Sequence, residues 1–184
     1  WEGETYLNLD KWGHFMGGAV LAQTLTESLL WSGFSVRTAV LLGTATSWAA
    51  LLEVEMKDAR FDQWGFSIPD FVANSVGASM PLIHSMWPSS RIVSFKFSYV
   101  PSSLYLGNHK RAAADRPHIE NLIDDYEGMT FWLSLSVEPH LRGRAAELWP
   151  DFLGLAVGYG AEGLHGSNVK SKGVNKFYPD RPDA

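Results

Sequence analysis

The feature that most constrains the fold is a change in the spacing of apolar residues near Pro88. Before Pro88, apolar residues recur at three- and four-residue intervals, as in a helix, and after it they alternate with polar or small residues, as in a strand. The change predicts an α+β chain, with an N-terminal helical bundle of about three helices followed by an antiparallel β-sheet of at least three strands. For 184 residues we expect a single domain, with a helical half over 1–88, a β half over 89–163 and a flexible or surface tail over 164–184.

Two long helices are expected at the start of the chain. The first covers roughly residues 10–34, with Gly33 as its stop signal, and the second follows the capping residue Ser35 and runs to Asp58. The second helix is uncharged only over residues 38–52. This stretch is shorter than the roughly 20 apolar residues that cross a membrane, so we do not expect a comfortable span.

The third helix is expected to open at Ser67-Ile68-Pro69-Asp70, which has the form of a capping box with an early proline. It continues to about His84, and Pro81 should kink or end it. No acidic or basic residue occurs from Phe71 to Ser90, but Asn74 and His84 argue against a lipid-facing helix.

Three stretches after Pro88 alternate with a period of two and predict strands. The apolar residues expected to share one buried face, covered by the helices or by lipid, are Phe95, Phe97, Phe131, Leu133, Leu135, Leu153, Leu155 and Val157. Small barrels need about eight strands, so three strands cannot close one. The sheet is therefore expected to lie on the helices, with lipid or another subunit as the alternative cover.

Charge and composition exclude several classes of function. The net charge is −5 with scattered Lys and Arg, which leaves no basic face for nucleic acid. The chain has no Cys, so thiol catalysis, disulfides and thiolate metal sites are impossible. It begins at Trp1 without a basic and then apolar leader, and we expect any secretory or lipoprotein signal to lie outside this sequence.

One glycine motif suggests a nucleotide but does not fit. Residues Gly158 to Gly163 match the spacing G-x-G-x-x-G after a predicted strand. The motif requires a helix to open at that turn, and the residues that follow are poor helix formers. Gly158 and Gly160 instead continue the small face of the strand. We expect no nucleotide and no cofactor, and no nucleophile motif indicates an activated serine.

Polar residues at apolar positions of the predicted helices form the one candidate site. They are Asp10, Lys11, His14, Glu55, Asp58, Asp70 and Asn74. Their three- and four-residue spacings let each helix direct two polar groups at a common centre. One interpretation is a buried hydrogen-bond network, a second is a metal site of His14 with Glu55, Asp58 or Asp70, and a third is unrelated surface charge. No catalytic, cofactor-binding or metal-ligating role is assigned.

The order of three motifs also resembles a known family. They are Asp10-Lys11-Trp12-Gly13-His14-Phe15, then Glu55-Met56-Lys57-Asp58, then Gly65-Phe66-Ser67 followed by Asp70, Asn74 and Gly77. Over residues 10–82 the chain resembles the YfiM-like family of predicted periplasmic and outer-membrane lipoproteins. Asp125-Tyr126-Glu127-Gly128 and residues 155–160 are similar to the β-rich extension of longer members. The resemblance implies the bacterial cell envelope, at the outer membrane facing the periplasm, and brings no activity with it.

These observations favour a non-enzymatic envelope protein, an accessory or scaffolding component. Its expected partner is membrane lipid or another envelope protein, reached through aromatic and alternating apolar surface. The alternative is a metal-dependent or acid/base hydrolase of an envelope substrate that uses His14 with Glu55, Asp58 or Asp70. A solvent-open arrangement of these side chains would favour the hydrolase, and closure in mutual hydrogen bonds would favour the accessory role.

Overall fold

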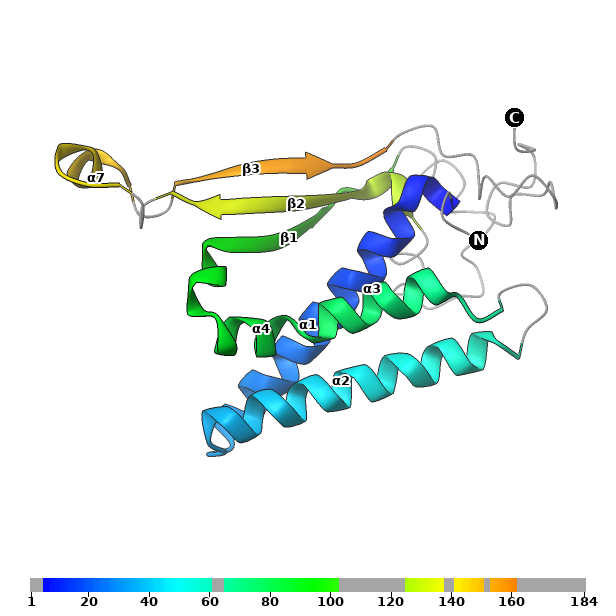
Figure 1. Cartoon of the computed structure of the whole chain (residues 1–184). Helices are drawn as coiled ribbons and strands as arrows, with labels where there is room; N and C mark the ends of the chain where they lie inside the picture. Colours follow the sequence, from blue (N-terminus) through cyan, green and yellow to red (C-terminus); the bar gives the residue numbers. More distant parts are fainter. Residues whose placement is uncertain (1–4, 61–64, 103–124, 138–140, 151–152, 162–184) are drawn as a thin grey trace. The chain divides into compact units, whose positions relative to one another are not determined.

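The computed structural model describes residues 5–60, 65–102, 125–137, 141–150 and 153–161. Helices come first and a three-stranded antiparallel sheet follows, so the predicted α+β class is confirmed (Figure 1). The elements are η1 (Thr5–Asn8), α1 (Leu9–Trp31), α2 (Val36–Asp58), α3 (Ile68–Ala78), α4 (Met80–Met86), η2 (Pro88–Ile92), β1 (Val93–Tyr99), η3 (Tyr126–Gly128), β2 (Met129–Ser136), α7 (Arg144–Leu148) and β3 (Gly154–Tyr159). The predicted tail over 164–184 lies outside the described residues.

The chain divides into two compact units that cut across the predicted halves. The smaller unit combines residues 1–10, 97–132 and 158–184, and the larger one combines 11–96 and 133–157. Each strand of the sheet contributes residues to both units. The larger unit holds α1 from Lys11 onward together with α2, α3, α4, η2 and α7, and the smaller unit holds η1 and η3. The two units are described separately below.

The predicted ends of the two long helices are confirmed. Gly33 has a positive φ of 90°, and its N–H donates to the Leu30 carbonyl oxygen while the Phe34 N–H donates to the Leu29 carbonyl oxygen. This pair of bonds is a Schellman ending, which a left-handed glycine makes possible. At the next start, the Ser35 side chain accepts a hydrogen bond from the Thr38 N–H.

The third predicted helix is divided in two. Ser67 caps α3 by accepting from the Asp70 N–H, as the capping box predicts. Pro81 lies in the first turn of α4, where its missing N–H costs nothing, so the break falls at Ser79, just before the proline. Residues 144–148, for which no element was predicted, form the short helix α7.

The helices of the larger unit pack through small side chains. A Cβ on Gly77 would collide with the Phe15 carbonyl group, and one on Gly18 would lie 2.7 Å from the Asn74 carbonyl oxygen. Where α1 meets α2, the Ser47 hydroxyl donates to the Gly18 carbonyl oxygen at 3.2 Å. The backbones of α1, α2 and α3 therefore approach closely, as small residues allow.

By length and composition α2 is apolar enough to cross a membrane, although its charge-free stretch is short. Core helices of soluble proteins pass the same test. In α2, 28% of the apolar window is buried inside the molecule. The rest of that window is not buried by the residues that the structure describes.

The sheet has the order β1-β2-β3. Burial does not alternate along its strands as the sequence predicts, since all six residues of β3 are exposed, and in β2 Ser134 is buried while Leu133 and Leu135 are exposed. On the small and polar face, Trp132 donates to the Ser98 Oγ at 2.9 Å, and a Cβ on Gly158 would lie 2.7 Å from the Trp132 ring. Trp132 thus reaches both neighbouring strands, which explains why β3 carries glycine opposite it. On the apolar face, Phe97 and Phe131 stack with centroids 5.4 Å apart.

The helices cover only part of the predicted apolar face, and cover by lipid stays a prediction. Phe131 is buried, and Phe95 packs on Phe15 of α1 with ring centroids 4.6 Å apart. The other six are at least 42% exposed, namely Phe97, Leu133, Leu135, Leu153, Leu155 and Val157. In the larger unit, Trp12 and Phe15 of α1 contact Phe95, whereas Leu133 and Leu135 of β2 remain exposed.

Candidate functional site

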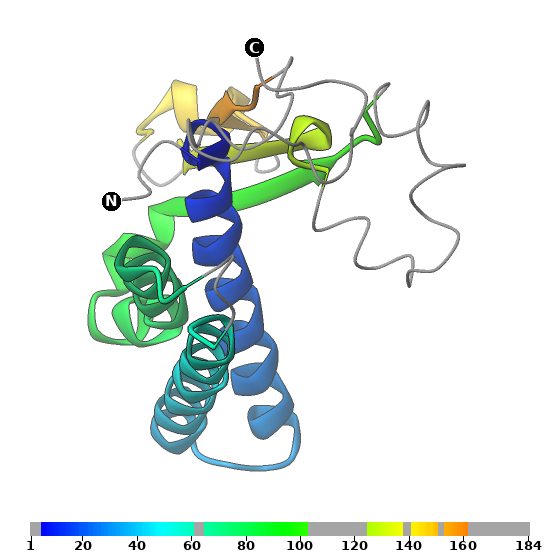
Figure 2. The ribbon, with the colours of Figure 1, turned by 90° about the vertical axis from the view of Figure 1, so that its right-hand side faces the viewer.

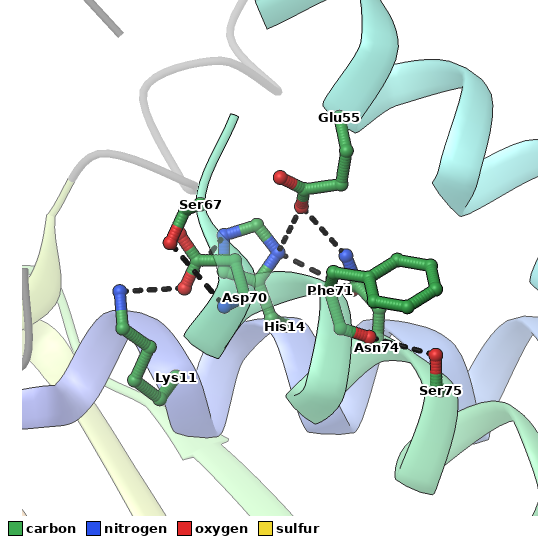
Figure 3. Close-up of polar contacts among 8 residues, drawn as sticks. All are labelled: Lys11, His14, Glu55, Ser67, Asp70, Phe71, Asn74 and Ser75. Atoms are coloured by element: carbon green, nitrogen blue, oxygen red, sulfur yellow. Dashed lines mark hydrogen bonds and ion pairs between the residues drawn. The ribbon is translucent and has the colours of Figure 1, made fainter. Parts of the chain in front are cut away.

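Five of the seven predicted polar residues meet between three helices of the larger unit. Lys11 and His14 come from α1, Glu55 comes from the last turn of α2, and Asp70 and Asn74 come from α3 (Figure 3). Four-residue spacing on α3 and three-residue spacing on α1 place each pair on one helix face. We call these five residues the polar network.

Asn74 links the imidazole to a buried carboxylate. Its Nδ2 donates to Glu55 Oε1 at 2.8 Å, which leaves its Oδ1 facing His14 Nδ1 at 3.2 Å. Since Oδ1 can only accept, His14 must carry a proton on Nδ1. His14 therefore donates to Asn74, and Asn74 donates to Glu55, so the two hydrogen bonds run in the same direction.

The other side of the imidazole faces an ion pair. Lys11 Nζ lies 2.6 Å from Asp70 Oδ1, and His14 Nε2 lies 3.8 Å from the same oxygen. His14 Nδ1 is also 3.8 Å from Glu55 Oε1, so the ring stands between two carboxylates (Figure 3). The cation of Lys11 compensates the charge of Asp70, which is nearly buried.

Burial differs across the polar network. The Glu55 side chain is 3% exposed and Asn74 is 2% exposed, whereas the His14 side chain keeps 30% of its surface. Burial raises the pKa of the Glu55 carboxyl above its ordinary value of 4.5. Attraction to His14 opposes this rise, while repulsion from Asp70 and Asp58 adds to the pKa.

The remaining two predicted residues are not among the five. Asp58 ends α2, half-buried, and acts on Glu55 through the repulsion of like charges. Asp10 is buried in the first turn of α1 and belongs to the smaller unit.

Another buried acid, in the smaller unit, was missed by sequence reasoning. Asp125 in the smaller unit is 3% exposed, and its Oδ2 accepts from the Tyr99 hydroxyl at 3.0 Å and from the Ser102 N–H at 2.8 Å. Gly128 packs beside it, since a Cβ there would lie 2.8 Å from Asp125 Oδ2. The only sequence signal was the motif Asp125-Tyr126-Glu127-Gly128. This acid joins the end of β1 to the start of β2.

The geometry of the polar network suits a structural role. Each of its buried carboxyl and amide groups has a partner inside the network, which is what a polar group in a helix interface requires. In the described part of the chain, no group of three or more His, Asp or Glu side chains is arranged to hold a metal ion. The most open side chain of the polar network is that of His14.

Comparison with known families supports the envelope. Residues 1–85 match the family model described as a predicted periplasmic lipoprotein (DUF2279). This match covers the helices that build the polar network, and residues 86–184 lie outside it. No curated protein and no solved structure gave a match. The helical part of the chain is therefore similar to that family of predicted periplasmic lipoproteins, and the similarity indicates an envelope protein.

Proposed function

We propose that this chain is a non-enzymatic accessory or scaffolding component of the bacterial cell envelope. The finer proposal places it among the YfiM-like members, at the outer membrane facing the periplasm, in contact with membrane lipid or another envelope protein. One observation carries the non-enzymatic role: Asn74 closes His14 and Glu55 into a single hydrogen-bonded chain inside the helix interface. The family match over residues 1–85 supports the envelope.

The exposed apolar side chains support an accessory role. The apolar face of β2 and β3 carries Leu133, Leu135, Leu155 and Val157 in the open, and β3 is an edge strand among the described ones. Large apolar side chains left on a surface mark a contact with a partner or with lipid. An enzyme of a small substrate would instead collect such residues in a cavity.

Cell fractionation tests the location. The native gene would be expressed in a bacterial host. The envelope fractions would then be separated on a density gradient. We expect the protein in the outer-membrane fraction. An added protease should degrade it only after the outer membrane has been permeabilised. Recovery in the cytosolic fraction would overturn the proposal.

One observation favours the hydrolase as a second candidate: His14 keeps an open edge and lies 3.8 Å from both Asp70 and Glu55. Metal linkage separates the two functions. If Zn²⁺ or Mn²⁺ raised the melting temperature of the wild type but not of His14→Ala, binding to the folded state would favour the hydrolase. We expect no such difference. Arg37→Ala, away from the polar network, is the control for non-specific cation effects.

A further inference from the structure

The helix α3 buries polar residues and exposes apolar ones, which is the reverse of a helix in a water-soluble bundle. Its buried residues are Asp70, Asn74, Gly77 and Ala78. Its exposed residues include Ile68, Val72 and Val76, which are 67%, 52% and 47% exposed and follow one another at four-residue intervals along one face. A surface helix in water buries its apolar face and exposes its polar one. In α3 these three large apolar side chains point away from the protein.

The neighbouring helix α2 repeats this pattern. It buries Ala39, Gly43 and Ser47 at four-residue intervals, and Glu55 further along the same side. Its exposed side carries Leu41, Leu42, Trp48 and Met56. Among the described residues of the larger unit, Ser47 is the largest side chain that is fully buried. The buried apolar side chains of this unit among the described residues are Phe15, Val40 and three alanines, so the interior offers little apolar burial to hold these helices together in water.

The exposed faces of α2 and α3 are continuous. The two helices run antiparallel, side by side, in both ribbon views (Figures 1 and 2). Trp48 of α2 donates to the Ser75 hydroxyl of α3 at 3.0 Å, and its ring meets Phe71 at 5.8 Å. We call the surface around this junction the outer helix face, and define it by Leu41, Trp48, Met56, Ile68, Val72 and Val76.

Charge is excluded from most of this surface. No acidic or basic residue occurs over 38–52 or over 71–90, and the exposed charged pair Glu53 and Lys57 lies towards the end of α2. A protein partner usually meets a surface with a polar, hydrogen-bonding rim. Asn74, which argued against a lipid-facing helix, points inward to Glu55 and leaves the outer helix face apolar.

Small residues at helix contacts, polar bonds between helices and large apolar side chains outside are together the pattern of helices packed in lipid. The charge-free stretch of α2 would span about 22 Å at 1.5 Å per residue, which is short of the roughly 30 Å core of a bilayer. We propose that the outer helix face contacts the acyl chains of a phospholipid bilayer without crossing it. This inference rests on the proposed function and names lipid as its partner.

Labelling with a fluorescent probe tests the contact directly. Because the full chain has no Cys, single cysteines can be introduced as Leu41→Cys and Val72→Cys and labelled with a polarity-sensitive dye. The control is Thr24→Cys, an exposed position on the polar side of α1. Vesicles of phosphatidylethanolamine and phosphatidylglycerol would carry nitroxide groups on their acyl chains. We expect a blue shift and loss of emission at positions 41 and 72, and neither at position 24.

Two results would overturn the lipid contact. In the first, aqueous iodide still quenches the fluorescence of the labels at 41 and 72 in the presence of vesicles. In the second, the chain remains a dimer in the presence of vesicles and the labels escape quenching by the nitroxide groups, so that a second copy and not lipid covers the outer helix face. Circular dichroism confirms that each variant is folded. Envelope localisation together with water-exposed labels would reject the lipid contact and leave the proposed function standing.

Discussion

At the scale of single residues, Asn74 holds the polar network together. Among the described side chains, it is the one that contacts both His14 and Glu55 through hydrogen bonds, and it does so with different atoms. The sequence predicted the members of the polar network from their spacing on each helix. It could not predict which of these side chains bond to one another across helices, because the spacing within a helix does not fix the rotation of one helix against another.

Removing Asn74 should cost more stability than removing His14. Asn74→Ala leaves both Glu55 and His14 without their amide partner, whereas His14→Ala deprives only the Asn74 oxygen. Each stranded buried group costs about 1–3 kcal/mol in the free energy of unfolding. Thermal and denaturant unfolding followed by circular dichroism would measure the difference. Gln23→Ala, which removes an exposed hydrogen bond to Glu27, serves as the control and should be nearly neutral.

The stability of the wild type should fall relative to Glu55→Gln as pH rises. Burial raises the folded-state pKa of Glu55 above 4.5, so the folded chain keeps a proton there that the unfolded chain has already released. The folded state binds more protons in this window, and stability therefore decreases from pH 4.5 up to the raised pKa. Glutamine still accepts the Asn74 bond but does not ionise. Equal pH profiles of the two proteins would show that Glu55 is not desolvated.

At the scale of secondary-structure elements, the sequence predicts the features that depend on neighbouring residues. The caps at Ser35 and Ser67, the ending at Gly33 and the three strands all depend on residues within a few positions. The cover of the sheet depends on where distant helices pack, and alternation in a strand says only which residues share a face. For that reason alternation could not predict how far the helices cover the apolar face.

Glycine substitutions test the close helix packing. A Cβ at Gly77 would meet the backbone of Phe15, which cannot move without displacing α1, so Gly77→Ala should destabilise the protein. Gly17→Ala is the matched control, since a Cβ there would have nothing within 4 Å and helical alanine is favoured over glycine by about 0.5–1 kcal/mol. We expect opposite signs in the change of melting temperature. Two neutral substitutions would contradict the close approach of α1 and α3.

On the sheet, the exposed fractions reverse the ranking that alternation alone suggests. Alternation predicts that Leu133→Asp disrupts the strand and that Ser134→Asp is mild. Leu133 is 42% exposed and Ser134 only 5%, so an aspartate at 134 would be the buried charge. We therefore expect Ser134→Asp to be the more damaging substitution for the isolated chain. Soluble yield and near-ultraviolet circular dichroism would compare the two, and a greater loss with Leu133→Asp would show that the apolar face is covered.

At the scale of the whole molecule, the outer helix face and the apolar face of the sheet are two of the places where the described residues expose apolar surface. A chain with 13% aromatic residues exposes many of its large side chains, because among the described residues only Leu9, Phe15, Val40, Met129 and Phe131 are large, apolar and buried. The buried polar network fixes the helices against one another by directional bonds. It thereby leaves the large side chains free for contacts outside the chain.

This distribution predicts how the purified protein behaves. Without detergent, the outer helix face is exposed to water, and the chain should self-associate because burying a large aliphatic side chain gains about 1.5–3 kcal/mol. A mild detergent should return it to a monomer with unchanged helix content.

Replacing Val72 and Val76 together by serine removes two adjacent members of the outer helix face without touching the polar network. This double variant should need less detergent in analytical ultracentrifugation and should bind phospholipid vesicles less tightly. The control is a double variant at exposed polar positions of α1, Gln23→Ala with Glu27→Ala, which should behave like the wild type. A wild-type chain that stays monomeric in buffer and ignores vesicles would contradict the prediction.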